Sequence, residues 1–322
     1  MISNVSLEKA ANLLSSAESV LIFPHINPDG DALGSCAALC RALRNENKEA
    51  WILLEEDVPG YLSFMDIEFC TQNPGCIMEP DICICVDCSE ERRFPDRAEK
   101  YNSGRTKMCI DHHATSGSFG DYYYIDGAEA ATAQIIYKLL LEMGARIDRS
   151  IAASLYTGIS TDTGNFQYSN TTPETHMIAA ELMRTGMDHV SITVALYQNV
   201  SLRKVRLEAR ILDRMEIFAG GRAVISYVDS SMLQEVSAVM EDSESAIDTL
   251  RNIEGVEIAA FLKEKGDAVK VSMRAKSAGR VDEIAVKFGG GGHAKAAGCT
   301  LDMSVSEAAD AIKKEIISYL EK

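Results

Sequence analysis

Four short stretches of this 322-residue sequence concentrate acidic and histidine side chains. They are HINPDGD (25–31), VDCS (86–89), DHH (111–113) and TDTG (161–164), and they hold three of the six histidines. Imidazole and carboxylate together suit divalent transition metals such as Mn²⁺. Several carboxylates in one pocket would repel each other, whereas two cations about 3.5–4 Å apart would neutralise them and stabilise the attacking and leaving oxygens of phosphoryl transfer. The residue types therefore predict a two-metal site for phosphate chemistry.

Each stretch also has a purely structural interpretation. NPDG is a common turn, in which Asp29 would cap the following helix. Asp87 at a strand end would cap a helix in the same way, and Asp162 would bond nearby backbone in TDTG. The adjacent His112 and His113 fit such an interpretation less well, because neighbouring side chains after a strand point in different directions. The combination of all four stretches favours the metal site.

The first half of the sequence alternates apolar runs with helical patterns. Uninterrupted apolar strands between helices indicate an α/β fold with a parallel sheet that is covered on both faces. Ligands of such sheets bind at the carboxyl ends of the strands. His25, Asp29, Asp87 and Asp111 fall at these ends. Strands are expected at 19–23, 49–54, 81–87 and 107–111, and helices at 32–44, 129–143 and 150–160.

The second half of the sequence predicts a smaller α+β domain. Residues 173–218 look helical, and Gly220 and Gly221 interrupt the pattern. The amphipathic segment 201–218 also offers a face for a second copy in a homodimer. Further strands are expected at 222–228, 256–264 and 268–275, and helices at 244–252 and after Ser304. The expected domains are an N-terminal catalytic domain (1–188), a helical linker (189–220) and a second domain (221–322).

Composition limits the partners of the chain. A net charge of −16 argues against binding long duplex DNA, although a short anionic substrate held by metal ions and a few arginines is compatible with it. No run of 18 uncharged apolar residues occurs, so we expect no membrane span. Cys83, Cys85 and Cys88 form C-x-C-x-x-C, which could be a thiolate metal site. A buried core is favoured instead, because Cys83 and Cys85 lie on one face of an expected strand and free cysteine behaves as a small buried hydrophobe. No disulfide framework is evident, which points to the cytoplasm.

The glycine-rich stretch KFGGGGHAKAAG (287–298) is a candidate anion site in the second domain. Four successive glycines let the backbone approach an anion closely and form a nest of N–H groups. A helix that began near His293 would add positive potential there. A flexible linker is the alternative interpretation of the glycine run.

The stretches HINPDGDALGS, VDCS, IDHH, TGISTDTGNF and GGGGHAKAAG, in this order, resemble the DHH phosphoesterase superfamily with a C-terminal DHHA1 domain. The resemblance covers nearly the whole chain and is closest to bacterial bifunctional oligoribonucleases that also dephosphorylate 3′-phosphoadenosine 5′-phosphate (pAp). It implies two Mn²⁺ ions, with Mg²⁺ or Co²⁺ as alternatives. It also implies that Asp111 orients a histidine and that His113 faces the substrate phosphate, both as catalytic residues. The implied ligands of one ion are His25, Asp29 and Asp87, and those of the other are Asp31, Asp87, His112 and Asp162.

The resemblance further implies the residues that hold the substrate in the second domain. The family uses GGGH and the arginine of an S-x-R strand for the terminal nucleotide and its phosphate. The corresponding residues here are Ser272, Arg274, Gly290, Gly291, Gly292 and His293. Arginine suits phosphate because its planar fork donates two parallel hydrogen bonds. Arg92 and Arg93 are further candidates, with a solvated surface pair as the alternative.

The expected activity is metal-dependent hydrolysis of short single-stranded oligonucleotides to mononucleotides, together with removal of the 3′-phosphate of pAp. The second domain is expected to close over the active site and to exclude long strands. A linear or cyclic dinucleotide phosphodiesterase and an inorganic pyrophosphatase are alternatives within the same superfamily. A non-catalytic nucleotide-binding protein of the same fold is the alternative from another class.

Overall fold

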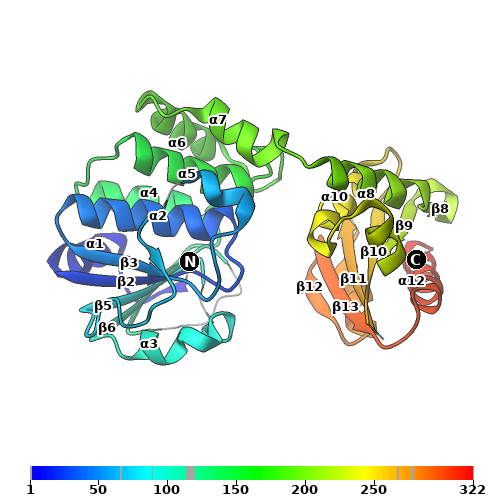
Figure 1. The fold of residues 1–322 in the computed structure, drawn as a ribbon, viewed down its shortest axis with the longest axis horizontal. Helices are drawn as coiled ribbons and strands as arrows, with labels where there is room; N and C mark the ends of the chain where they lie inside the picture. The colour runs from blue at the N-terminus through cyan, green and yellow to red at the C-terminus, as the bar shows by residue number, and fades with distance from the viewer. Residues whose placement is uncertain are drawn as a thin grey trace. The chain divides into compact units, whose positions relative to one another are not determined.

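The computed structural model describes residues 2–65, 67–88, 90–113, 120–266, 268–276 and 279–321. The chain divides into two compact units, Met1–Asn199 and Val200–Lys322, and each unit is built around its own β-sheet. Figure 1 labels the elements of each unit. The residues of the predicted linker are divided between the units, because 189–199 belong to the first unit and 200–220 to the second.

The first unit holds a seven-stranded sheet within the residues that the structure describes, and six of its strands run parallel. The remaining strand, β1, pairs antiparallel with β7 at one edge. The predicted α/β fold with a parallel sheet is confirmed. In sheet order the strands are β1 (Ile2–Ser3), β7 (Tyr122–Ile125), β6 (Thr106–Asp111), β5 (Ile82–Val86), β2 (Ser19–Phe23), β3 (Glu49–Leu53) and β4 (Cys70–Thr71).

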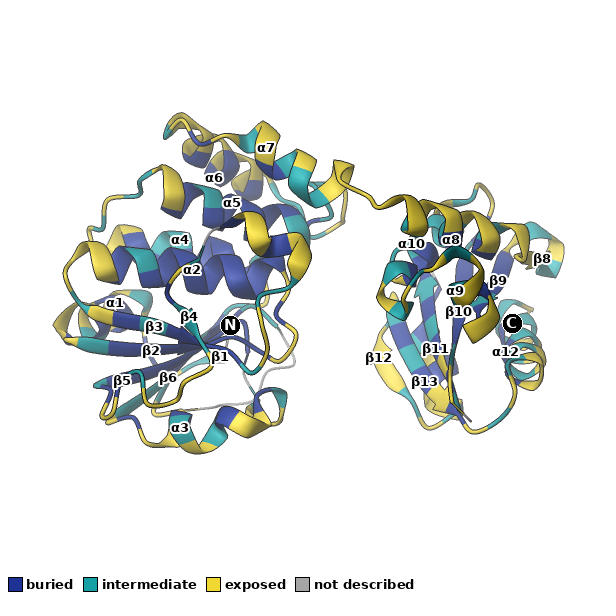
Figure 2. Cartoon of the chain, viewed as in Figure 1, coloured by how far each residue is buried: buried dark blue, intermediate teal, exposed yellow. Residues whose placement is uncertain are grey.

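Alternate residues of the central strands are buried on opposite faces of this sheet. In β5, Ile82, Ile84 and Val86 lie in one apolar cluster, whereas Cys83 and Cys85 lie in another. Both faces are covered, which explains why the sequence of this strand is apolar without interruption. Figure 2 shows the central strands as buried. The predicted core position of the two cysteines is confirmed.

Helices cover both faces of the first sheet (Figure 1). One face packs against α1, α2, α4 and α5, and the other packs against Phe94 and against Tyr101 of α3. Helices α6 and α7 and a π-helical turn follow α5 along the chain. The helices of this unit are α1 (Leu7–Ser16), α2 (Gly30–Asn45), α3 (Ala98–Asn102), α4 (Thr132–Glu142), α5 (Arg149–Asp162), α6 (Pro173–Arg184) and α7 (His189–Thr193), and the π-helical turn is Val194–Gln198.

The second unit holds a six-stranded mixed sheet within its described residues, and the predicted smaller α+β unit is confirmed. Helices α11 and α12 pack on one face, whereas α8, α9 and α10 cover β9 and β10 on the other. In sheet order the strands are β12 (Gly291–His293), β13 (Ala296–Leu301), β11 (Ala268–Ala275), β10 (Ile258–Lys265), β9 (Ala223–Val228) and β8 (Glu216–Phe218). The helices are α8 (Leu202–Asp213), α9 (Ser230–Val236), α10 (Ala246–Asn252), α11 (Val281–Lys287) and α12 (Val305–Leu320).

The amphipathic segment predicted over 201–218 is shorter than expected. Helix α8 ends at Asp213, and the last three residues of the segment form β8, which pairs antiparallel with β9. Leu207 and Ile211, on the apolar face of α8, are fully buried inside the second unit. This face therefore packs within its own unit, and the homodimer stays a prediction.

The expectation of a helix that begins near His293 is wrong. This residue ends β12, which forms a hairpin with β13. The preceding glycines end helix α11 instead. The N–H groups of Gly289 and Gly290 donate to carbonyls of the last turn of α11, at 3.0 and 2.9 Å, in the two bonds of a Schellman motif. Gly289 has a φ of +72°, a conformation that favours glycine. Two of the N–H groups expected in an anion nest are therefore used by the helix cap.

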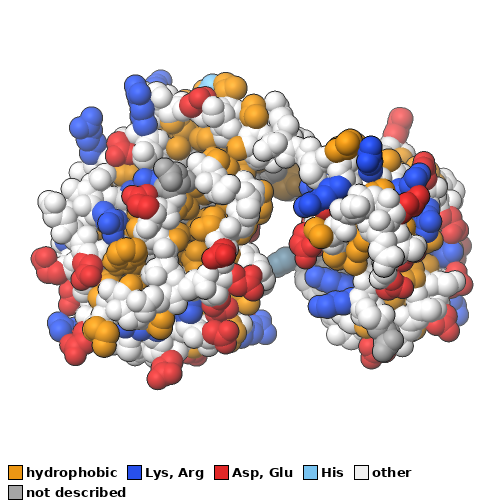
Figure 3. Space-filling model, viewed as in Figure 1, with side chains coloured by type: hydrophobic (Ala, Val, Ile, Leu, Met, Phe, Trp, Pro, Cys, Tyr) orange, Lys and Arg blue, Asp and Glu red, His pale blue; other side chains and the backbone are white. Residues whose placement is uncertain are grey.

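The surface carries mixed charge despite the net charge of −16. On the view in Figure 3, acidic and basic side chains are interspersed on both units. Many of the basic side chains form ion pairs, such as Arg203 with Asp242 at 2.8 Å and Arg222 with Glu257 at 2.9 Å. Among the described residues, no helix has both the length and the apolar composition needed to span a bilayer.

Candidate metal centre

The carboxyl ends of three neighbouring strands bring most of the predicted residues together. β6, β5 and β2 are adjacent in the first sheet. Asp111 is the last residue of β6, Asp87 directly follows β5, and His25 lies two residues after β2. Parallel strands end at the same edge of a sheet, so these side chains converge. His112 follows β6, Asp29 and Asp31 lie at the start of α2, and Asp162 is the last residue of α5.

Asp87 has an unusual backbone conformation. Its φ of +58° lies in the left-handed region, which costs most residues roughly 1–2 kcal/mol and which aspartate tolerates better than most. Its N–H still donates to the carbonyl of Ile110, at 2.9 Å, so the residue remains attached to the sheet. The surrounding structure therefore maintains a strained turn at the residue that is central to the predicted site, a feature common at functional sites.

Glycines allow α2 and α5 to approach closely enough to bring their acidic residues together. A Cβ atom on Gly34 of α2 would lie 2.5 Å from the carbonyl oxygen of Ser154. A Cβ atom on Gly158 of α5 would lie 2.8 Å from Asp31 Oδ1. Both distances are too short for any larger residue without displacement of the neighbouring helix. The contact places the first turn of α2 beside the last turn of α5.

The first group of potential ligands contains His25, Asp29 and Asp87. His25 Nε2 lies 3.6 Å from Asp87 Oδ2 and 3.9 Å from Asp29 Oδ2. Asp29 also caps α2, because its Oδ1 accepts hydrogen bonds from the N–H groups of Asp31 and Ala32. The two interpretations of Asp29 are therefore compatible, since one oxygen caps the helix while the other faces the histidine. The ligand atoms of this group lie within 4.8 Å of one another.

The second group forms around His112. Its Nε2 lies 3.4 Å from Asp162 Oδ2, 3.8 Å from Asp87 Oδ1 and 3.9 Å from Asp31 Oδ2. Asp87 thus directs one oxygen toward each group, as a bridging ligand would. The structure brings together all six residues that the sequence nominated as metal ligands.

The hydrogen bonds of His25 and His112 orient both rings in the same sense. His25 Nδ1 lies 2.7 Å from the carbonyl oxygen of Ile26, and His112 Nδ1 lies 3.2 Å from that of Glu129. Each Nδ1–H donates to backbone, so each Nε2 presents its lone pair to the carboxylates. Burial lowers the pKa of His25, which favours the neutral imidazole that binds metals.

His113 is arranged differently from the other two histidines. Its Nδ1 donates a hydrogen bond of 2.7 Å to Asp111 Oδ1. This bond raises the pKa of His113 and outweighs the opposing effect of burial. The same Nδ1 lies 3.7 Å from Asp87 Oδ1, but its hydrogen bond to Asp111 makes it a poor metal ligand. This hydrogen bond is the contact expected if Asp111 orients a histidine, and the catalytic roles of both residues stay a prediction.

Thr132, at the start of α4, connects two of the carboxylates, and sequence reasoning missed it. Its hydroxyl donates to Asp87 Oδ1 at 2.8 Å, and its N–H donates to Asp31 Oδ2 at 2.6 Å. The N–H of Ala133 donates to the other oxygen of Asp31 at 2.9 Å. Asp31 therefore caps α4, whose N-cap residue Ala131 makes no side-chain hydrogen bond. No local signal marks Thr132, because its partners are 45 and 101 residues away in sequence.

The electrostatics of the centre test whether a cation fits. Burial, followed by repulsion from neighbouring carboxylates, raises the pKa of Asp87 well above its usual value and that of Asp162 to about 8. Burial also raises the pKa of Asp31. Within the described part of the chain, no lysine or arginine forms an ion pair with these three residues or with Asp29. Buried carboxylates with only imidazole opposite them fit divalent cations.

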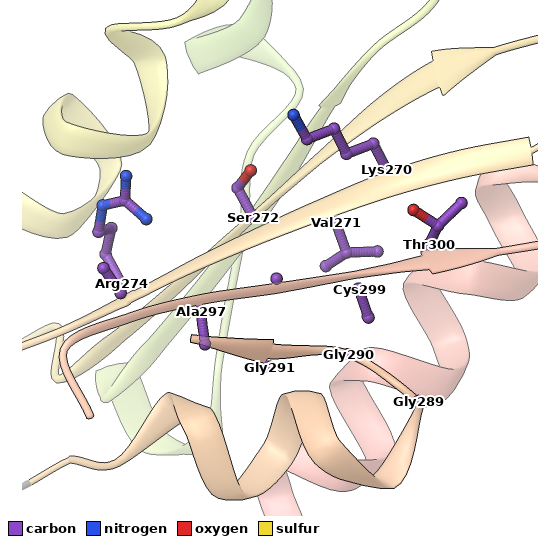
Figure 4. A pocket seen from close by; sticks show the side chains of 12 residues that line it. Lys270, Val271, Ser272, Arg274, Gly289, Gly290, Gly291, Ala297, Cys299 and Thr300 are labelled. Atoms are coloured by element: carbon purple, nitrogen blue, oxygen red, sulfur yellow. The ribbon is translucent and has the colours of Figure 1, made fainter. Parts of the chain in front are cut away.

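The structure also brings together several residues nominated for substrate binding in the second unit. Arg274, Ser272, Gly290 and Gly291 line a hollow of about 660 Å³ on β11, β13 and the start of β12. Figure 4 shows Ser272 and Arg274 on the same side of β11. Gly292 and His293 lie in β12, where His293 pairs with Ala296 and Ala296 pairs with Arg274.

Of the two arginines nominated in the first unit, the structure places Arg93 nearer to the histidines. Arg92 is 82% exposed and pairs with Glu90, as a solvated surface pair would. The charge of Arg93 acts on both His25 and His113, whose pKa values it lowers. The backbone of Arg93 also lies close to His25, because its carbonyl accepts from the N–H of the neighbouring Ile26 at 2.7 Å.

Two family matches agree with this architecture, which combines a parallel sheet, acidic and histidine residues at its edge, and a smaller second unit. Residues 19–159 match the DHH family, N-terminal domain, and residues 220–322 match the DHHA1 domain. These matches cover most of the chain. The chain belongs to the DHH family, in a form that carries a DHHA1 domain.

The chain is similar over nearly its whole length to named proteins. It is 34% identical to the bifunctional oligoribonuclease and PAP phosphatase NrnA of Thermus thermophilus, covering 95% of this chain and 93% of that protein. It is 28% identical to the protein of the same name from Bacillus subtilis, covering 89% and 91%. Among solved structures, it resembles an exopolyphosphatase-related protein from Bacteroides fragilis, with a TM-score of 0.90 and 25% identity over 97% of this chain and 96% of that one.

Proposed function

We propose that this chain is a divalent-metal-dependent phosphohydrolase that degrades short oligonucleotides to mononucleotides and removes the 3′-phosphate of pAp. The observation that carries the proposal is the convergence of two ligand groups on the two oxygens of Asp87. The names of the similar proteins from Thermus thermophilus and Bacillus subtilis support the choice of substrates.

We assign the ligands as the two geometric groups suggest. His25, Asp29 and Asp87 would hold one ion, and Asp31, Asp87, His112 and Asp162 would hold the other. Nitrogen and oxygen donors of this kind suit Mn²⁺, with Mg²⁺ or Co²⁺ as alternatives. When bound, such ions activate water and stabilise negative charge on phosphoryl oxygens.

His113 and Asp111 supply the proton chemistry beside the ligands. Asp111 Oδ1 accepts the Nδ1 proton of His113, so Nε2 is the ring atom available to the substrate. The raised pKa keeps this imidazole protonated to higher pH, and its Nε2–H can donate to a phosphoryl oxygen or to the leaving oxygen. Charge from Arg93 adds to the attraction for an anionic substrate.

The second unit supplies the contacts to the rest of the substrate. Arg274 lines the hollow on β11 and β13, and among the described residues its guanidinium donates only to the carbonyl of Met273, at 3.2 Å. Its guanidinium can therefore bind a phosphate in a bidentate manner. Gly291, beside which a Cβ atom would meet nothing within 4 Å, leaves space for a ligand backbone to approach.

The proposal is tested by a time course of product release from trinucleotides labelled at the 5′ or 3′ end and from pAp. The full chain is incubated with Mn²⁺ or with a chelator, and cyclic and linear dinucleotides are included as further substrates. We expect mononucleotides and phosphate only with the metal. The label that appears first as a mononucleotide gives the direction of degradation.

Asp87→Asn should abolish hydrolysis of every substrate, because both ions lose a ligand. Asp310→Asn is the matched control, since Asp310 is a 75% exposed aspartate on α12 and the change in charge is the same. Binding of oligonucleotides without turnover under both conditions would instead favour a nucleotide-binding protein. Turnover confined to a cyclic dinucleotide would replace the proposed substrates.

A further inference from the structure

One face of the second sheet is only partly covered by helices. Helices α8, α9 and α10 bury Val224 and Phe261 of β9 and β10, and the hollow of about 660 Å³ lies beside them on β11, β13 and β12. Figure 2 shows exposed or half-buried residues along these three strands. We call this surface the β11 platform and define it by Lys270, Ser272, Arg274, Gly291, Ala296, Gly298 and Thr300.

The register of the strands determines which side chains belong to the β11 platform. Lys270, Ser272 and Arg274 alternate with residues such as Val271 and Met273, which are buried on the other face. Their partners on β13 are Thr300, Gly298 and Ala296. Figure 4 shows Lys270, Ser272 and Arg274 on one side of β11. The platform thus has small residues in its centre and a cation at each end.

Lys270 has no acidic partner among the residues that the structure describes, although the chain as a whole is strongly acidic. Among the described residues, no ion pair includes Lys270 or Arg274, and no aspartate or glutamate lines the hollow. Directly opposite Lys270 on β10 stands another lysine, Lys263. Lys263 is paired with Glu244 at 2.5 Å, so the charge of this glutamate is already used. Like charges opposite each other destabilise a sheet, and a bound anion would remove this cost.

The spacing of the two cations limits the anion that both can hold. Arg274 lies four positions after Lys270 on the same strand, which corresponds to about 13 Å between their backbone positions. Adjacent phosphates of a nucleic acid are joined by six bonds of about 1.5 Å, so they lie less than about 9 Å apart. Two phosphates separated by one further phosphate match the distance better than two neighbours do.

We propose that Lys270, together with the hydroxyl of Thr300 opposite it, forms a second phosphate subsite for single-stranded oligonucleotides. Arg274 takes one phosphate, and Lys270 takes the phosphate two positions further along the same strand. The inference rests on the proposed function for its substrate class. It makes Lys270 a residue that distinguishes a trinucleotide from shorter ligands.

The test measures binding to the full, metal-free chain in the presence of a chelator. Under this condition the acidic metal centre repels anions, so binding reports on the second unit. The probes are AMP and the 5′-phosphorylated di- and triadenylates, and affinity is measured by titration calorimetry at several salt concentrations. The variants are Lys270→Gln, Lys270→Arg and the matched control Lys314→Gln, which removes the same charge from an exposed position on α12.

We expect Lys270→Gln to weaken binding of the trinucleotide about 10-fold, as the loss of one charge-assisted contact does. The salt dependence of the trinucleotide affinity should fall by about 0.7 in slope, the amount for one phosphate of a single strand. AMP and the dinucleotide should bind unchanged. Lys270→Arg and Lys314→Gln should behave as the wild type.

Equal weakening by Lys270→Gln and Lys314→Gln would overturn the subsite, because it would reflect net charge alone. An equal loss for AMP and the trinucleotide would also overturn it, since Lys270 would then contact the same phosphate as Arg274. Absence of trinucleotide binding to the metal-free wild type would do the same. Failure of hydrolysis with Mn²⁺, combined with the expected binding pattern, would refute the proposed enzyme while leaving the subsite in place.

Discussion

Replacing Thr132 by valine should weaken metal binding although all six predicted metal ligands are kept. Valine has the shape of threonine but lacks the hydroxyl that donates to Asp87 Oδ1 at 2.8 Å. The backbone N–H of residue 132, which caps onto Asp31, is unchanged by the substitution. The residue is fully buried, so water cannot replace the lost donor easily. The variant therefore removes one hydrogen bond from the carboxylate that bridges the two ligand groups.

The size of the effect follows from the charge of the acceptor. Hydrogen bonds to ionised groups contribute about 1.5–3 kcal/mol, which corresponds to roughly 10- to 100-fold in an equilibrium constant. The bond from Thr132 lowers the pKa of Asp87 against the effect of burial. Without it, a proton competes more strongly with Mn²⁺ for the carboxylate. Outer hydrogen bonds of metal ligands generally change affinity by about the same factor of 10–100.

The assay is a calorimetric titration of the metal-free chain with Mn²⁺, followed by kcat/KM for a trinucleotide at limiting and saturating Mn²⁺. Thr157→Val is the matched control, because Thr157 is also buried but donates to the carbonyl of Ala153 in its own helix, at 2.8 Å. Thr132→Ser keeps the hydroxyl and should restore the affinity. An unchanged Mn²⁺ affinity in Thr132→Val, or an equal loss in Thr157→Val, would refute the reasoning.

Three further predictions concern the same centre. Gly158→Ala should lower the free energy of unfolding by about 1–2 kcal/mol and weaken Mn²⁺ binding, because overpacking against Asp31 outweighs the gain in helix propensity. Gly60→Ala is the control, since Gly60 has open space around it, and equal melting temperatures of the two variants would contradict the close packing. In the metal-free chain, the folded state binds the proton of Asp162 more tightly than the unfolded state does. The free energy of unfolding should therefore fall as pH rises from 3.8 to about 8. Denaturant titrations that show no decline over this range would argue against the buried acidic cluster. Asp111→Asn keeps an oxygen that can accept from His113 Nδ1 but removes the negative charge that raises the pKa of His113. The alkaline limb of kcat/KM should therefore move to lower pH while Mn²⁺ affinity is retained, and a pH profile identical to the wild type would exclude this role.

Local patterns predicted much of the catalytic half. The run SVLIF gave a strand at the predicted residues because its four consecutive apolar side chains, Val20 to Phe23, fit a strand buried on both faces. Acidic and histidine residues directly after such runs indicated one edge of a parallel sheet, and the structure brings the six nominated ligands together there. The prediction succeeded because the carboxyl ends of all strands in a parallel sheet lie at the same edge, whatever segments connect the strands.

Contacts between distant segments lie outside what local patterns show. The role of Thr132 depends on where α4 begins relative to α2 and β5, and no neighbour in sequence reveals it. The glycine run illustrates the same point, since Gly289 and Gly290 cap α11 and a hairpin follows where a helix was considered. Glycine is compatible with a nest, a cap or a tight turn, so only the surrounding structure selects among them.

The sequence by itself determined the fold class, the family and the group of metal-binding candidates, because these depend on residue type and on hydrophobic periodicity. Tertiary structure alone decided which oxygen of Asp87 faces which histidine, and which face of β11 remains open. Lys270 alternates with buried residues in a way that is ordinary for any strand. Within the described part of the chain it has no acidic partner, and this becomes visible only when strand register and helix packing place Lys263, Glu244 and the covering helices.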